Sequence, residues 1–319
     1  MAEAAPDPKP WREPRQWLTQ RTAHLSPVPR ALLWSATSGL LFCLLNALMR
    51  VMAQHLPAMQ VQFLRYLFGF LVLLPLILRH GPAAYRTTRP LGQFLRGALH
   101  TVGLVLWFAA LSHIPLADTT AIGFTGPLFI MIGAYLFLKE PMHWERWLAT
   151  GIGFAGVMIV VGPKLAGSGG WHHLVMLASA PVFAGSFLLT KVLTRTEGAG
   201  VIVVWQAITV TLFSLPAALW VWQAPGPAQW LAFAFCGLLG SGGHYCLTRS
   251  FRVADISSTQ SVKFLELVWA STLGWLMFAD VPTQTTLLGG AVISAATLWV
   301  ARREHRRVLV VVPVDEHEA

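Results

Sequence analysis

Charged residues and cysteines are scarce in this sequence. Only 12% of the 319 residues are charged, about half the share that is usual in soluble domains. The three cysteines, Cys43, Cys236 and Cys246, fall inside apolar segments and predict neither a disulfide framework nor a metal cluster. A phosphate-binding loop and an HExxH motif are absent, which argues against nucleotide hydrolysis and zinc chemistry. This composition excludes a water-soluble globule.

Long apolar runs are present instead, since 55% of the residues are hydrophobic. A helix of about 20 residues crosses the ~30 Å hydrocarbon layer of a bilayer. Ten such runs predict an all-α integral membrane protein with ten transmembrane helices. We expect these helices at residues 31–53, 60–79, 92–111, 117–138, 147–163, 172–193, 200–222, 229–251, 257–278 and 284–301.

Basic residues alternate between the predicted loops. If the N-terminus is cytoplasmic, the inner loops and tails hold eighteen Lys and Arg residues, and the outer loops hold Lys164 alone. Cytoplasmic loops are enriched in Lys and Arg, so both termini are expected in the cytoplasm. The same placement accounts for the net charge of +9 without a nucleic-acid partner.

The chain divides into two apolar halves and two tails. Residues 1–30 are polar and Pro-rich, and are expected to form a disordered cytoplasmic tail. Residues 31–163 and 172–301 hold five predicted helices each, and residues 302–319 form a second cytoplasmic tail.

A weak internal repeat relates the two halves. At an offset of 140 the matched pairs include Gly97 with Gly237, Gly103 with Gly243, and Glu140 with Asp280. Because five helices is an odd number, the second half must cross the membrane in the opposite sense to the first. Such inverted repeats are typical of secondary transporters, which bind substrate near the midplane between the repeats.

Several apolar motifs resemble those of the drug/metabolite transporter superfamily, in its EamA-type branch. The motifs are Arg65-Tyr66-Leu67 through Pro75, Gly126-Pro127-Leu128-Phe129, Leu136 through Glu140, and Leu265 through Asp280. The resemblance covers about residues 31–301. It implies ten helices in two inverted five-helix repeats, a central cavity and alternating access. Two departures are Asp280, where the family usually has Glu, and Leu267, where proline is common.

Ionisable residues at membrane depth are functional candidates, because each costs at least ~2.5 kcal/mol to insert. Lys263 and Glu266 lie three residues apart on one stripe of span nine, with Trp269 beside them. Either this pair fixes helix packing, or Lys263 binds a substrate carboxylate and Glu266 is a protonatable switch. Glu266 is the candidate for proton coupling.

Two histidines lie on Gly-rich predicted helices. His100 shares a stripe of span three with Arg96 and Trp107, and His244 lies in span eight beside Tyr245. They are either hydrogen-bonded packing residues or ligands for substrate. No metal site is expected, because the spacing of metal-binding histidines is absent, and no cofactor is expected either.

Spans two and four carry further candidates. Arg65 either extends to the lipid headgroups or faces inward onto a substrate carboxylate. In the family an arginine recurs near this place, which favours the inward orientation. Pro127 leaves the Gly123 carbonyl without its helical partner and predicts a kink or hinge. Phe124 shares a face with Pro127 and is expected to line the cavity, with core packing as the alternative.

Small residues spaced four apart mark close helix contacts in spans five and ten. Gly151 precedes Ala155, and Gly290 precedes Ser294. Such pairs either seal helices within one copy or form a homodimer interface through these two spans.

We expect a secondary transporter that works by alternating access, and not an enzyme. A cavity with several cationic candidates and one carboxylate suits an amino acid or an amino-acid-derived anionic or zwitterionic compound, and export is favoured over import. The expected binding residues are Arg65, His100, Trp107, Phe124, His244, Tyr245, Lys263, Glu266 and Trp269. The expected partners are this small molecule and the lipid bilayer.

Other functions remain open. They are import of a flavin or nucleotide-like metabolite, multidrug export, passive conduction, and intramembrane hydrolysis by Ser241 with His244. A bacterial inner membrane is the expected location, because Arg outnumbers Lys eighteen to five and Asn46 is the only asparagine. This bias is typical of a GC-rich genome.

Overall fold

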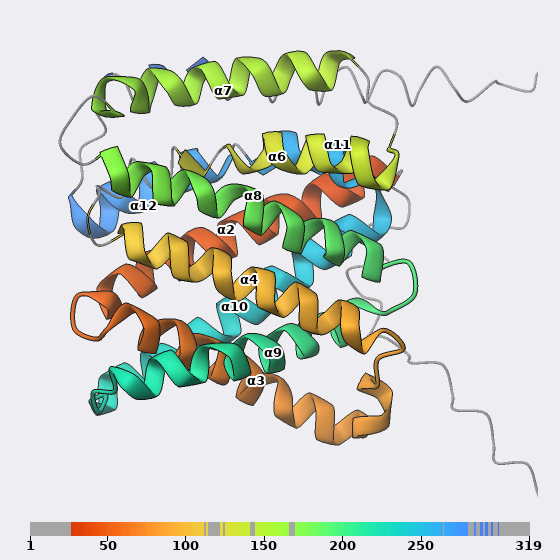
Figure 1. The fold of residues 1–319 in the computed structure, drawn as a ribbon, viewed down its shortest axis with the longest axis vertical. Coiled ribbons are helices and arrows are strands. Elements are labelled where there is room, and N and C mark those ends of the chain that lie inside the picture. The colour runs from red at the N-terminus through yellow and green to blue at the C-terminus, as the bar shows by residue number, and fades with distance from the viewer. Residues whose placement is uncertain are drawn as a thin grey trace, which may run out of the picture.

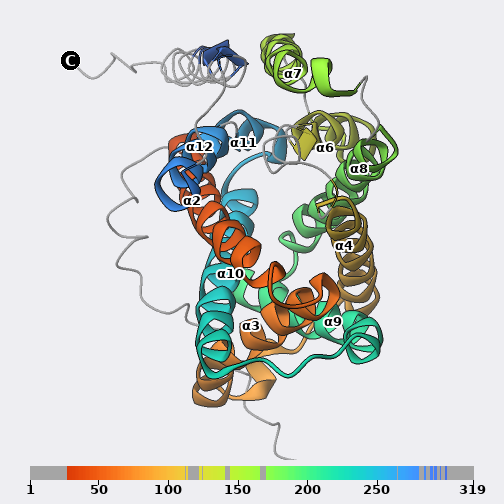
Figure 2. The same ribbon diagram turned by 90° about the vertical axis from the view of Figure 1, so that its left-hand side faces the viewer.

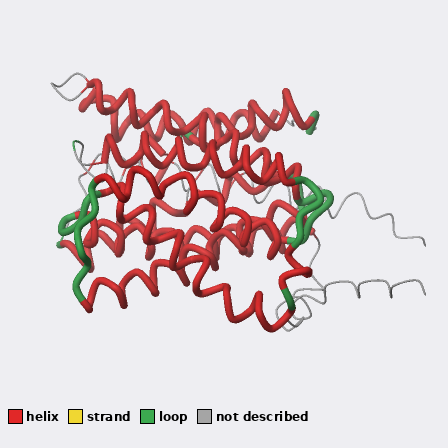
Figure 3. The backbone as a smooth tube through the Cα atoms, turned by 60° about the horizontal axis from the view of Figure 1, so that its bottom comes forward, coloured by secondary structure: helices red, strands yellow, loops and turns green. Residues whose placement is uncertain are grey.

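The protein is a bundle of roughly antiparallel helices (Figures 1 and 3). The computed structural model describes residues 27–111, 113, 122–123, 125–140, 144–165, 170–263, 265–279, 284, 288, 289, 291, 292, 295 and 299, and none of these forms a strand. The helices of the first half are α2 (Pro27–Ala53), α3 (Ala58–His80), the 3-10 turn η1 (Pro82–Tyr85), α4 (Pro90–Leu111), α6 (Gly126–Gly133), the π-helix η2 (Ala134–Leu138) and α7 (Trp144–Leu165). Those of the second half are α8 (Gly170–Leu193), α9 (Ala199–Trp220), α10 (Pro227–Val253), α11 (Ile256–Lys263) and α12 (Leu265–Phe278).

Within the described residues, five helices are long and apolar enough to cross a membrane, namely α2, α3, α8, α9 and α10. Large apolar side chains on their outer faces, such as Leu78, Leu219 and Trp220, are exposed, as lipid contact requires. The predicted span 284–301 lies largely outside the described residues. The count of ten helices therefore stays a prediction.

In span four, α6 begins at Gly126, directly before the proline at which the sequence predicts a kink. Pro127 lies in the first turn of α6, where its missing N–H breaks no helical bond. Thr125 precedes the helix, and its carbonyl accepts from the Leu128 N–H at 3.0 Å. Pro127 therefore begins a helix, and a hinge motion at this point stays a prediction.

In span nine every described residue from 256 to 278 is helical, as the single predicted helix requires. Its two segments are labelled α11, up to Lys263, and α12, from Leu265, and residue 264 between them lies outside the described part of the chain. Glu266 lies on α12. The Lys263 side chain is also outside the described set, so its predicted pairing with Glu266 stays a prediction.

Helices of the two halves pack in exchanged pairs (Figure 2). The most extensive contacts join α2 to α10 and α4 to α8, and α3 packs against α9. The spans of the two halves correspond in order, so α8, α9 and α10 are the counterparts of α2, α3 and α4. Exchanging each helix for its counterpart turns the α2–α10 pair into the α8–α4 pair and leaves the α3–α9 pair unchanged. The contact of α6 with α8 corresponds in the same way to that of α11 and α12 with α2.

The glycines paired in the sequence make equivalent close contacts. A Cβ on Gly97 of α4 would lie 2.1 Å from the Thr209 side chain of α9, and one on Gly237 of α10 would lie 2.5 Å from the Phe68 backbone of α3. The other pair is alike, since a Cβ on Gly103 would meet Phe183 of α8, and one on Gly243 would meet Phe42 of α2, both at 2.9 Å. A side chain at Gly237 would collide with the α3 backbone, and at the other three positions the facing side chain would have to move.

Basic loop residues gather at one end of the bundle, to the right in Figure 1. α2, α4 and α9 begin at this end, and α3, α8 and α10 finish there. We call it the basic end; its cations include Arg79, Arg86, Arg89, Lys139, Lys191, Arg195, Arg249 and Arg252. This gathering is the pattern that the loop charges predict, while the membrane side that each end faces stays a prediction.

Candidate functional site

A cavity of about 270 Å³ lies between helices of both halves. Its lining comes from α2, α3, α4, α6, α8, α10 and α12. On α2 and α4 the lining residues fall in the half of the helix farther from the basic end, residues 42–49 and 100–107. The end that carries the α2–α3 turn and the α9–α10 loop is called the cavity end below. The volume is slightly below the ~300–1,000 Å³ range of small-molecule sites.

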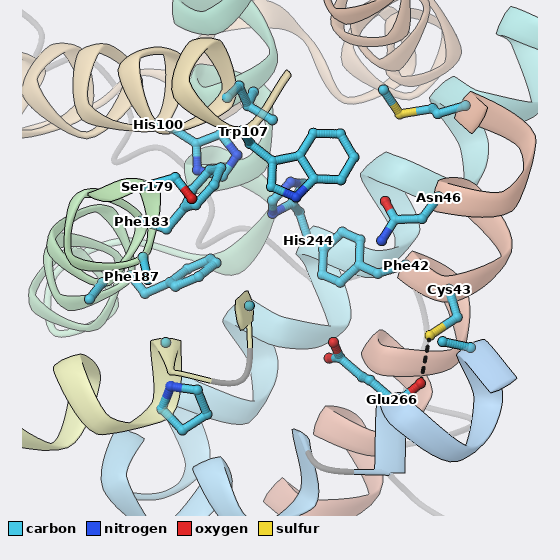
Figure 4. A pocket seen from close by; sticks show the side chains of 18 of the residues that line it. Phe42, Cys43, Asn46, His100, Trp107, Ser179, Phe183, Phe187, His244 and Glu266 are labelled. Carbon is cyan, nitrogen blue, oxygen red and sulfur yellow. Dashed lines mark hydrogen bonds between the residues drawn. The ribbon is translucent and has the colours of Figure 1, made fainter. Parts of the chain in front are cut away.

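Aromatic side chains form much of the cavity wall (Figure 4). Phe42 of α2, Trp107 of α4, and Phe183 and Phe187 of α8 all line it. The rings of Phe183 and Phe187 are nearly parallel, with centroids 6.4 Å apart. Such a wall offers flat apolar faces on which a ring can stack.

Arg65, His100 and His244 lie together in the cavity lining. The Arg65 guanidinium is 6% exposed and places Nη2 3.5 Å from Nε2 of His244. Tyr66 of α3 joins the two histidines, because its hydroxyl lies 2.8 Å from His100 Nε2 and 3.3 Å from His244 Nε2. Arg65 therefore faces inward, and does not extend to the headgroups.

A second set of polar residues supports this group from behind. Arg96 of α4 is 2% exposed, and its guanidinium donates to Thr190, to the Ile202 carbonyl and to Gln206 Oε1. The Gln206 amide nitrogen lies 3.3 Å from His244 Nε2. These bonds link α4, α8, α9 and α10, so one network joins the two halves beside the cavity.

Glu266 lines the cavity from α12 and lies apart from His100 and His244 (Figure 4). Its half-buried side chain lines the cavity, and Figure 4 shows the carboxylate pointing into the open space. Its backbone carbonyl accepts from Cys43 Sγ at 3.4 Å. A Cβ on Gly39 would lie 2.9 Å from Glu266 Cγ, so this glycine leaves room for the side chain to pass α2.

The structure brings five of the nine predicted binding residues together. Arg65, His100, Trp107, His244 and Glu266 all line the cavity, and Pro127 lines it too. Their role in binding stays a prediction. Phe124 lies outside the described residues, and so does the side chain of Lys263.

Tyr245 and Trp269 are not in the cavity lining. Each follows or precedes a lining residue, and neighbours on a helix point about 100° apart. Tyr245 packs edge-on against Trp34, with ring centroids 6.4 Å apart. The Ser241 hydroxyl donates to the Gly69 carbonyl at 3.1 Å, a helix-packing bond that does not direct it toward His244.

Sequence reasoning missed the remaining aromatic wall and two polar residues of the network. Phe42, Phe183 and Phe187 resemble lipid-facing residues in an apolar run. Tyr66 and Gln206 are uncharged, so a search for ionisable groups passes over them. A signal was available, because any polar group buried in hydrocarbon needs a hydrogen-bond partner.

The comparisons with known proteins agree over most of the chain. Residues 29–162 and 170–302 each match the EamA-like transporter family. The chain is 36% identical over 278 residues to a riboflavin transporter of Rhizobium johnstonii, covering 86% of this chain and 92% of that protein. It is 31% identical to an S-adenosylmethionine uptake transporter of Rickettsia bellii, covering 82% and 89%.

Two further proteins resemble this chain at lower sequence identity. A pseudopaline exporter of Pseudomonas aeruginosa is 27% identical, over 82% of this chain and 92% of that one. A protein of known crystal structure has the same fold, with a TM-score of 0.71 at 18% identity, over 87% of this chain and 98% of that one. Since the family matches account for both halves, this chain belongs to the EamA-like transporter family of membrane transporters.

Proposed function

We propose that this protein carries a small metabolite with a flat heteroaromatic ring, riboflavin being the first candidate, inward across a bacterial inner membrane. The observation that carries this proposal is the aromatic cavity with the buried Arg65 on its wall. The names of the riboflavin and S-adenosylmethionine relatives support a heteroaromatic solute, and the latter name supports uptake. No bond is made or broken in the substrate.

The chemistry of riboflavin matches the cavity wall in three ways. Its tricyclic ring can stack against Trp107 and the two phenylalanines of α8. The carbonyl edge of the ring accepts hydrogen bonds, and the Arg65 guanidinium is a donor only. Its hydroxylated chain suits the amide of Asn46 and the hydroxyl of Ser179, which also line the cavity.

The movement proposed is alternating access between two inverted five-helix repeats. The exchanged helix pairs and the equivalent contacts of Gly97 and Gly237 support this arrangement. Substrate would bind between the repeats, and rocking of one against the other would expose the cavity to each side in turn.

A second candidate is export of an amino-acid-derived zwitterion. Glu266 and Arg65 both line the cavity, so the site offers a carboxylate and a guanidinium to the opposite charges of one solute. The pseudopaline exporter among the relatives supports this alternative.

Uptake of radiolabelled riboflavin into proteoliposomes tests the first candidate directly. The purified protein is expected to concentrate riboflavin, and Trp107→Ala is expected to reduce uptake strongly. Trp220→Ala is the matched control, because Trp220 is 90% exposed on the outer surface. Absence of riboflavin uptake, together with export of an amino-acid derivative by the same vesicles, would replace the first candidate by the second.

A further inference from the structure

The network behind the cavity contains an amide whose orientation is fixed by its neighbours. A guanidinium can only donate hydrogen bonds, so the atom of Gln206 that faces Arg96 must be the carbonyl oxygen, Oε1. The amide nitrogen of Gln206 therefore faces Nε2 of His244, 3.3 Å away. Gln206 is 1% exposed and Arg96 is 2% exposed, so water competes little for these bonds.

His244 Nε2 is approached by two groups that have only hydrogens to offer. One is the Gln206 amide nitrogen and the other is Nη2 of Arg65, at 3.5 Å. The Tyr66 hydroxyl, 3.3 Å from the same nitrogen, can either donate or accept, so two of the three groups around Nε2 require an acceptor. A lone pair on Nε2 satisfies both of them, with the ring proton on Nδ1 and the ring neutral.

We propose that Gln206, itself held by Arg96, is a positioning residue that keeps His244 a neutral acceptor and so holds the Arg65 guanidinium against the cavity. This proposal rests on the proposed function, because it assigns Arg65 the electron-rich edge of the transported ring. Substrate affinity then does not follow the titration of His244.

The charged and titratable groups around His244 favour the same state. α3 brings Arg65 and Tyr66, and α4 brings Arg96 and His100. α2 brings Cys43 and α12 brings Glu266 to the same cavity. Two buried guanidiniums already stand on this side, so a further positive charge on His244 would add repulsion in a medium of low dielectric.

His100 continues the same hydrogen-bond network on the other side of Tyr66. The Tyr66 hydroxyl is nearer to His100 Nε2 than to His244 Nε2, at 2.8 Å against 3.3 Å. If Tyr66 donates to His100, the His100 ring proton lies on Nδ1, facing the Ser186 hydroxyl at 3.3 Å. Ser186 in turn donates to the Arg96 carbonyl.

Gln206→Glu tests the proposal without any substrate. A carboxylate would still accept from Arg96, but it would face His244 Nε2 with an acceptor, and the ring should take up a proton to supply the missing donor. Gln223→Glu is the matched control, because Gln223 is exposed at the cavity end and the change adds the same charge. Gln206→Met serves as a second variant and removes the amide without adding charge.

Nitrogen NMR of protein labelled in the histidine rings reads the protonation state, with the His244 signal assigned by its loss in His244→Asn. The wild type and Gln223→Glu are expected to show a neutral ring with the proton on Nδ1 at neutral pH. Gln206→Glu should show a charged ring, and Gln206→Met a mixture of the two neutral forms. A charged ring or a proton on Nε2 in the wild type would overturn the proposal.

Riboflavin binding, measured by the quenching of riboflavin fluorescence, tests the effect of Gln206 on function. Wild-type affinity is expected to stay level between about pH 5 and 8, where free histidine changes its charge. Gln206→Glu is expected to bind about tenfold more weakly and to become pH-dependent, as the loss of one charge-assisted bond predicts. If the wild type does not bind riboflavin, the proposed substrate is wrong, and the NMR result still decides the role of Gln206. A level pH profile in Gln206→Glu with unchanged affinity would count against that role.

Discussion

The two ends of the bundle are closed by bonds of different strength. At the basic end, Lys191 Nζ donates to the carbonyls of Phe251 and Ala254 at 2.8 and 2.7 Å, and Glu140 Oε1 accepts from the Ile256 N–H at 3.1 Å. The last turn of α10 is thus capped by a charged side chain from α8, and the first turn of α11 by one from the segment that follows η2. Bonds to charged groups contribute about 1.5–3 kcal/mol each, against about 0.5–1.5 for neutral ones.

The Glu197 carboxylate makes a second set of charged hydrogen bonds at the basic end. This buried carboxylate follows α8 and accepts from the backbone N–H groups of Thr88 and Arg89, and from the Thr87 and Gln93 side chains. It therefore caps the N-terminus of α4, a helix of the other half, where a negative charge is favoured by the helix dipole.

The cavity end is joined by neutral groups in the described residues. Gln60 and Gln223 exchange two bonds, from the Gln60 amide to the Gln223 carbonyl at 2.5 Å and from the Gln223 N–H to Gln60 Oε1 at 2.8 Å. The cavity lies in this half of α2 and α4. If the transporter alternates between two states, we expect the charged caps to break when the basic end opens.

The largest effect is expected from Arg65→Ala, which removes the cation of the cavity. Transport should fall about ten- to hundredfold, the cost of losing one or more charge-assisted bonds to substrate. Arg65→Lys should recover part of it, because lysine keeps the charge without the fork of donors. Arg79→Ala is the control, since Arg79 is exposed on the same helix at the basic end. Equal losses for Arg65→Ala and Arg79→Ala would mean that the cavity has no special role.

Lys191→Met should weaken the closed basic end and make the cavity reachable from that side. Cys43 lines the cavity and can report this if Cys236 and Cys246 are replaced by alanine. An impermeant maleimide should label Cys43 from the cavity end in this background, and from both ends after Lys191→Met. Arg195→Met removes another cation of the basic end, one that is exposed, and should leave the labelling unchanged. Labelling from the basic end before any change at Lys191 would contradict the comparison of the two ends.

Glu197→Ala should lower stability by about 1–2 kcal/mol, the usual cost of removing a helix cap. Glu197→Gln keeps an acceptor and should lose less, so the order of thermal melting is wild type, then Gln, then Ala. Melting of the detergent-purified protein measures this order. If both variants melt together, the charge is not what stabilises the cap.

The sequence predicts much of this fold because its long helices, such as α2, α3 and α9, are continuous apolar runs. Span two was expected at 60–79 and α3 runs from Ala58 to His80. The offset of 140 also has a local counterpart, because Lys139 and Ala279, 140 positions apart, both adopt left-handed backbone at φ 54°. Each ends a helix directly before one of the paired acids, Glu140 and Asp280. The repeat therefore extends to the way its helices end.

Which residues line the cavity depends on the direction in which each side chain points. Periodicity does not predict this direction in a helix that is apolar all round. His100 and His244 stand out as polar residues in such helices, but Phe42 and Phe183 do not differ in type from lipid-facing residues. The adjacent residues Tyr245 and Trp269 were placed in the cavity by nearness in sequence alone. Pairing the repeats would have helped, because Gly243 and Gly103 contact Phe42 and Phe183 in the same way.

The smallest effect is expected from Trp107→Phe, which keeps an aromatic ring in the cavity but makes it smaller. An aromatic pair contributes about 0.5–1.5 kcal/mol beyond the area it buries, so substrate affinity should weaken by only about two- to tenfold. The maximal rate should not change if the ring contributes to substrate binding and not to the movement of the helices. Trp220→Phe, on the lipid-facing surface, should change neither quantity. Separate fits of KM and maximal rate decide the matter, and a fall in rate at constant KM would assign Trp107 to the movement of the helices.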